Sequence, residues 1–127
     1  MNMRSPLGRV RGLGSAKSGT QHWWAQRLTA LALVPLAVWF VIAMITATGS
    51  DYAAAQAFIG DPVTAVLLIL LIAATFHHAQ LGLQVVIEDY VHSKPTELVL
   101  LLAVKAAAIV LALAAIFAVL SIAFGGA

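Results

Sequence analysis

The 127-residue chain is 62% hydrophobic and only 9% charged, with a mean hydropathy of +0.99 and a formal net charge of +2. A soluble domain is usually about half apolar and about a quarter charged, so this composition excludes a soluble globular protein, a disordered chain and a coiled coil. It also argues against a nucleic-acid partner. Cysteine is absent, which excludes disulfides, thiolate metal sites and iron–sulfur clusters within this chain.

The first 27 residues hold five of the seven Lys and Arg side chains and no acidic residue. They faintly resemble a transit peptide, but they are rich in glycine, and the apolar run that follows is too long for a signal-peptide core. Such a charge bias is typical of a topology signal. We therefore expect residues 1–27 to form an uncleaved basic cytoplasmic tail and residues 28–124 to form the membrane domain.

Three apolar runs follow, and each is long enough to cross a bilayer. They cover about residues 28–48, 63–87 and 98–124. A helix needs about 20 apolar residues to span a hydrocarbon core of about 30 Å, and backbone polar groups in lipid must be satisfied within the segment. The sequence thus predicts an all-α membrane protein with three transmembrane helices.

The two connections between the runs carry turn residues and opposite charges. Residues 49–62 include Asp51 and Asp61 but no Lys or Arg, whereas the second connection contains Lys94. Asp61 followed by Pro62 is typical of a helix N-cap. The positive-inside rule places the N-terminus and the second connection in the cytoplasm, and the first connection and the C-terminus in the periplasm.

Few ionisable residues fall inside the runs, and such residues are costly in lipid and usually functional. His77 and His78 lie in the second run and Lys105 in the third. His78 and Asp89 are 11 residues apart, which leaves them within about 20° on one helix face. A histidine in lipid can bond a neighbouring helix, relay a proton or ligate a metal such as haem iron. Because adjacent histidines point about 100° apart, a haem here needs a second ligand from another chain.

The second run has His78, Gly82, Asp89 and Tyr90 at spacings that resemble the hydrophobic membrane-anchor subunit of succinate dehydrogenase, the small three-helix chain of respiratory complex II. The segment that begins with Arg27, followed by Leu-Thr-Ala, resembles the start of that family's first helix. The resemblance covers about residues 20–124. It implies a non-catalytic anchor for electron transport in the bacterial inner membrane, with the mitochondrial inner membrane as the less favoured location.

The resemblance also implies cofactors and roles. His78 is expected to be the axial ligand of the iron of haem b, which is shared with a partner chain, and Gly82 to allow the haem to approach closely. Tyr90 is expected to donate a hydrogen bond to ubiquinone, with Asp89 beside it. Arg27 is expected to meet a haem propionate or to line the quinone cleft. The expected partners are membrane lipid and the cytochrome b, iron–sulfur and flavoprotein subunits.

Purely structural roles are alternatives to cofactor binding for several of these residues. Arg27 and Lys105 can act as snorkelling interface anchors, and Lys105 can instead meet a propionate or a phospholipid headgroup. His77 is expected to make a structural hydrogen bond, and Tyr90 can be an aromatic of the membrane interface. For the whole chain, the alternatives are a fumarate reductase-type anchor, a cofactor-free assembly subunit, or a small transporter. A transporter is expected to need an intramembrane carboxylate, which the three runs lack.

Overall fold

The computed structural model describes residues 6–10 and 17–125, and all regular structure in this part of the chain is helical. The helices are α1 (Pro6–Val10), α2 (Lys17–Thr46), α3 (Tyr52–Gly60), α4 (Pro62–Tyr90) and α5 (Lys94–Ala123). The segments Gly19–Thr46, Pro62–Tyr90 and Lys94–Ala123 are long and apolar enough to cross a membrane. The predicted fold class, an all-α protein with three membrane-spanning helices, is confirmed. Arg4 and Arg11 of the expected basic tail lie outside the described residues.

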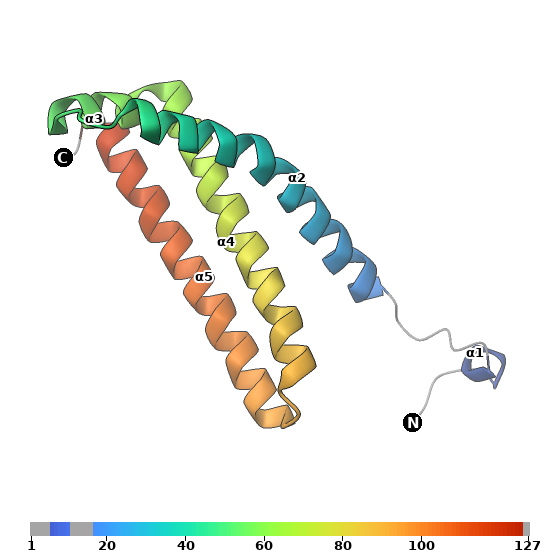
Figure 1. Ribbon diagram of the computed structural model, residues 1–127. Coiled ribbons are helices and arrows are strands. Elements are labelled where there is room, and N and C mark those ends of the chain that lie inside the picture. The colour runs from blue at the N-terminus through green and yellow to red at the C-terminus, as the bar shows by residue number, and fades with distance from the viewer. Residues whose placement is uncertain (1–5, 11–16, 126–127) are drawn as a thin grey trace.

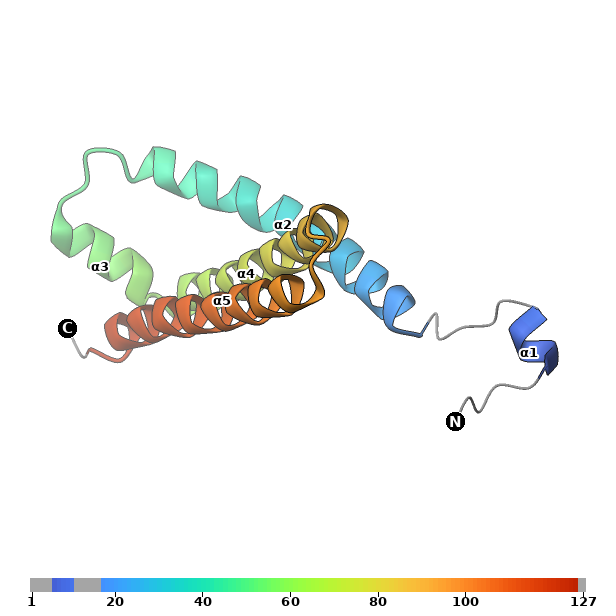
Figure 2. The same cartoon turned by 90° about the horizontal axis from the view of Figure 1, so that it is seen from below.

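The three long helices form an open layer, with α4 in the middle. The two views show α5 alongside α4 over most of its length, while α2 crosses α4 on the other side (Figures 1 and 2). Within the described residues the backbone of α2 comes close to that of α4 but not to that of α5. This arrangement gives α4 two different flanks, one facing α2 and the other facing α5.

Helix α2 begins well before the first apolar run. It starts at Lys17, so the segment from residue 17 to residue 27 is helical and continuous with the membrane-spanning part. Residues 17–27, which we expected to belong to the basic tail, therefore extend the first spanning helix toward the N-terminus. This extension carries His22 and Gln26 along the same helix as Thr29, which matters for the site described below.

The first connection contains a short helix, α3, that the turn residues alone did not predict. The carboxylate of Asp51 accepts a hydrogen bond from the Ala54 backbone N–H at 2.8 Å and so caps α3. Asp61 caps α4 in the same way, accepting from the Thr64 N–H at 3.0 Å, with Pro62 in the first turn as predicted. The Thr64 backbone bond is the main cause that lowers the pKa of Asp61 below its usual 3.8.

The small core lies at the α3 end of the layer. Ala65, Leu68 and Val119 are buried there, and Trp39 of α2 stacks on Phe58 of α3 with ring centroids 6.4 Å apart. Away from this end, most large apolar side chains of the spanning helices are exposed. A surface of that kind suits lipid or other membrane helices as its surroundings.

Candidate functional site

His78 is fixed against α2 by a hydrogen bond across the helix interface. Its Nδ1 lies 3.0 Å from the hydroxyl oxygen of Thr29, and both side chains are partly buried. The two helices run antiparallel, and each residue lies about twelve positions from its helix end, so the bond joins the inner parts of two spanning segments. In the described part of the chain, Nδ1 is the only ring nitrogen of His78 with a hydrogen-bond partner. The second nitrogen, Nε2, is left available for a ligand.

Gly82 lies one turn further along α4, beside the same flank. A Cβ built at this position would meet only Gln26 Nε2, at 3.8 Å, which is an ordinary van der Waals distance. Glycine costs about 1 kcal/mol relative to alanine inside a helix. The packing within this chain therefore does not require a glycine at position 82. Its lack of a side chain leaves space for a group that comes from outside the chain.

Two polar atoms near this flank are buried without a partner. They are Nε2 of His22 and Oε1 of Gln26, both on α2. His22, Gln26 and Thr29 follow one another at spacings of four and three, which places them on one face of the helix. Because Thr29 contacts His78 and Gln26 lies beside Gly82, this polar stripe faces α4. A buried polar atom is normally hydrogen-bonded, so these two point to a missing partner group or water.

Asp89 and Tyr90 lie at the last turn of α4, and both are exposed. Tyr90 is 79% exposed, and its hydroxyl has no hydrogen-bond partner among the described residues. At the helical rise, Tyr90 is about 18 Å from His78 along the axis, and Asp89 shares the face of His78. Helix α4 therefore carries two separate candidate sites, one at His78 within the span and one at Asp89 and Tyr90 at its end.

The Arg27 side chain does not lie next to His78. It lies two residues before Thr29 on α2, which turns it about 160° away from Thr29 around the helix axis. Its guanidinium lies 5.4 Å from the centroid of the Trp23 ring, in a cation–π contact. Within the described chain the polar groups near His78 and Gly82 are thus Thr29 and Gln26 rather than Arg27. The predicted role of Arg27 at a propionate or quinone stays a prediction.

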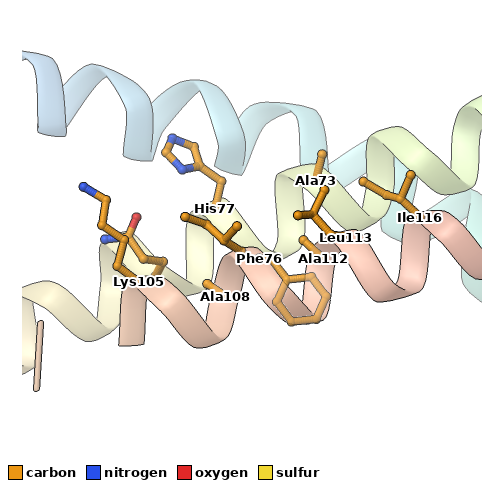
Figure 3. A pocket seen from close by; sticks show the side chains of 10 residues that line it. Ala73, Phe76, His77, Lys105, Ala108, Ala112, Leu113 and Ile116 are labelled. Carbon is orange, nitrogen blue, oxygen red and sulfur yellow. The ribbon is translucent and has the colours of Figure 1, made fainter. Parts of the chain in front are cut away.

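His77 lines a hollow of about 420 Å³ between α2 and α4, together with Thr29. It also lines a groove of about 320 Å³ between α4 and α5. Its polar groups are His77, Gln80 and Lys105, and its remaining lining is apolar. Figure 3 shows His77 and Lys105 toward one end of the groove and Ile116 toward the other. From Gln80, side-chain bonds continue through Gln84 to Glu88 at 3.4 and 2.8 Å. Among the described residues, His78 is thus hydrogen-bonded to α2, whereas His77 lines hollows on both flanks of α4 without such a bond.

Sequence comparisons identify the family. A profile described as "Succinate dehydrogenase/Fumarate reductase transmembrane subunit" matches residues 1–120. A succinate dehydrogenase hydrophobic membrane anchor subunit from Rickettsia bellii (strain RML369-C) is 34% identical over 118 residues, which cover 93% of this chain and 94% of the relative. The protein of the same name from Paracoccus denitrificans is 34% identical over 90 residues, 71% of this chain and 70% of the relative.

The chain belongs to the succinate dehydrogenase/fumarate reductase transmembrane subunit family. The predicted function, a membrane-anchor subunit of succinate dehydrogenase that is not itself catalytic, is confirmed by this membership. The three apolar helices agree with a multi-pass membrane protein.

The polar stripe on α2 was not predicted from the sequence. Arg27 carries a conspicuous charge near the membrane interface, whereas Gln26 is neutral and His22 is weakly charged at most. A signal for them was present in the sequence, since polar residues at four- and three-residue spacing before Thr29 define one helix face. The spacing alone does not indicate which neighbouring helix that face meets.

Proposed function

We propose that this anchor binds haem b together with a partner chain and contributes to a ubiquinone site in a succinate:quinone oxidoreductase of the bacterial inner membrane. The haem assignment rests on the surroundings of His78. Its Nδ1 is held by a hydrogen bond, which leaves Nε2 available as a ligand. The nearby Gly82 is a glycine that the packing of the chain does not require. Imidazole is a common haem ligand, and its second nitrogen normally makes an orienting hydrogen bond.

In this proposal His78 Nε2 supplies one axial ligand, and the partner cytochrome b subunit supplies the other. The described residues contain no group of three or more metal-ligating side chains, and His77 points about 100° away from His78 around the helix axis. Gly82 leaves room for the face of the macrocycle, and the unpartnered Gln26 and His22 offer polar contacts near it. The haem, when bound, supplies a one-electron redox centre in the membrane.

The quinone part rests on Tyr90 with Asp89 next to it. The Tyr90 hydroxyl is exposed and has no hydrogen-bond partner within the described chain, so it is available as a donor to a quinone carbonyl. A donor aimed at an oxygen that gains negative charge during reduction stabilises that charge. Because the end of α4 is open, the remainder of the quinone site must come from other subunits.

The orientation and partners follow from charge and from the exposed helix ends. In this proposal the N-terminal segment and the connection between α4 and α5 lie on the cytoplasmic side, where positive charge is retained. His92 and Lys94 of that connection are exposed and can contact an iron–sulfur subunit, which in turn carries the flavoprotein subunit. The exposed apolar faces of α2, α4 and α5 accept the cytochrome b subunit and lipid. We favour succinate oxidation over fumarate reduction as the working direction because the relatives named above are succinate dehydrogenase subunits.

The test is to purify the tagged chain from membranes under mild detergent, identify the chains that accompany it and record the reduced-minus-oxidised spectrum. We expect three further subunits and a b-type haem band in stoichiometric amount. A complete complex without a b-type band would contradict the haem assignment and leave a cofactor-free anchor. Recovery of the chain without the other subunits, in a detergent that preserves the complex in a known system, would contradict the proposed assembly.

A further inference from the structure

The Thr29 hydroxyl contacts two kinds of group at once. Its oxygen lies 2.7 Å from the carbonyl oxygen of Ala25 and 3.1 Å from that of Gln26, both in the preceding turn of α2. Those carbonyls can only accept hydrogen bonds, so the single hydroxyl proton of Thr29 is directed at them. The same oxygen lies 3.0 Å from Nδ1 of His78.

These contacts fix which nitrogen of His78 carries the proton. Since the Thr29 proton is already donated to the α2 backbone, the Thr29 oxygen accepts from His78, and Nδ1 must be the donor. A neutral imidazole with its proton on Nδ1 has a lone pair on Nε2. The other arrangement, with Thr29 donating to Nδ1, would place the proton on Nε2 and would break the backbone bond of the hydroxyl. The geometry therefore favours the tautomer that can ligate a metal through Nε2.

We propose that Thr29 is a positioning residue for His78: it holds the ring in the Nδ1–H tautomer and orients Nε2 toward the haem iron. This inference rests on the proposed haem ligation. A hydrogen bond donated by Nδ1 also makes the ring a stronger electron donor, which stabilises the ferric form and lowers the haem midpoint potential. The chain of hydrogen bonds from His78 through Thr29 links the ligand on α4 to the backbone of α2, so the α2–α4 crossing becomes part of the haem site.

The experiment compares Thr29→Val with Thr29→Ser in the assembled complex. Valine keeps the branched shape and removes the hydroxyl, whereas serine keeps the hydroxyl. We measure haem per flavin, the haem midpoint potential and the ferric low-spin EPR signal. Loss of an outer partner of a metal-bound histidine typically weakens binding about ten- to a hundredfold. We expect Thr29→Val to lose haem on dilution or to retain it with a raised potential and altered EPR signal, and Thr29→Ser to match the wild type.

Thr46→Val is the matched control. The Thr46 hydroxyl also donates to a backbone carbonyl of α2, that of Ala43 at 2.9 Å, but it contacts no histidine among the described residues. It should leave haem content and potential unchanged. Equal haem content, potential and EPR signal in wild type and Thr29→Val would overturn the role of Thr29. If Thr29→Val does not assemble, Thr29→Ala is measured instead; failure of both to assemble also overturns the proposal, because the hydroxyl is then needed for helix packing itself.

A His78→Ala complex separates this inference from the proposed function. Normal haem in His78→Ala would overturn the haem ligation itself. Loss of haem in His78→Ala together with wild-type behaviour of Thr29→Val would overturn only the positioning role. The two failures are therefore distinguishable in one set of spectra.

Discussion

The two flanks of α4 differ in a way that adjacent residues reveal. His78 contacts α2 and its Nδ1 is held by Thr29. His77 makes no hydrogen bond to another described residue and lines hollows toward both α2 and α5. The sequence step between them is one residue, or about 100° of helix rotation. On the α2 flank a glycine and two unpartnered polar atoms accompany the histidine, and on the α5 flank polar side chains bond to one another along the helix. Both flanks therefore have space for a group from outside. Among the described residues, only the α2 flank combines an oriented histidine ring with buried polar atoms that lack a partner.

Tyr90→Phe tests the last turn of α4, where the quinone is proposed to bind. Of the substitutions described in the next paragraphs, it is expected to change the measured rate most. The change removes one hydroxyl and keeps the ring, so assembly should survive. A hydrogen bond to a group that develops charge contributes about 1.5–3 kcal/mol, or about ten- to a hundredfold in rate. Quinone reduction should fall by that factor, as measured by succinate-dependent ubiquinone reduction at matched complex concentration.

Two controls sharpen the Tyr90 result. Succinate oxidation with a soluble dye acceptor should be unchanged, because it does not use the quinone site. The haem spectrum should also persist, since His78 lies about 18 Å away along the helix. If Tyr90→Phe reduces quinone at the wild-type rate, Tyr90 is an interface aromatic and not a quinone donor.

Gly82→Ala tests whether the α2 flank is shaped for an external group. Within the chain a Cβ at this position meets only Gln26 Nε2 at an ordinary 3.8 Å, so the chain itself should tolerate it and gain helix propensity. A methyl group forced against a closely packed haem costs at least about 1 kcal/mol, or about fivefold in affinity. We expect a lower haem-to-flavin ratio during dilution, measured next to Gly19→Ala, whose Cβ meets nothing within the described chain. Wild-type haem retention in Gly82→Ala would show that the glycine does not serve haem approach.

The pH dependence of the Asp61 cap gives the smallest expected effect. Hydrogen bonds from Thr64 lower the pKa of Asp61 in the folded chain. A group with a lowered folded pKa stabilises the fold above its unfolded pKa, here about 3.8, and this stabilisation is lost as pH falls through the lower folded value. Helix content in detergent should therefore drop slightly more below about pH 4 in the wild type than in Asp61→Asn, where asparagine caps without titrating. An identical acid profile in the two chains would contradict this account of the cap.

The fold could be predicted from the sequence to the extent that length and hydropathy decide it. Three apolar runs of about 20 residues or more leave few alternatives to three spanning helices, and Asp61 with Pro62 marks the start of α4 as predicted. Helix α3 was not predicted, because the Gly-Asp turn residues obscured a short alanine-rich segment capped by Asp51. The early start of α2 was not predicted either, since hydropathy records where lipid begins and not where a helix begins.

Only those parts of the candidate site that lie on one helix could be predicted from the sequence. The register of His78, Gly82 and Asp89 follows from about 100° per residue and needs no structure. The partner of His78 on α2 depends on the crossing of two helices, at residues 49 positions apart in sequence, and no periodicity within either helix specifies that crossing. Arg27 illustrates the same limit: its charge made it a candidate, but its helix face points away from His78, and Gln26 lies beside Gly82 instead.

The most direct test of the central claim is the absorption spectrum of paired histidine variants in the purified complex. His77→Ala and His78→Ala remove the same side chain from adjacent positions, so changes in volume and hydrophobicity are matched. The account predicts that His77→Ala keeps the reduced b-type band and that His78→Ala loses it or shows a changed band with a substitute ligand. A lost band in His77→Ala with a normal band in His78→Ala would contradict the account, because the haem ligand on α4 would then be one residue away from the position assigned here.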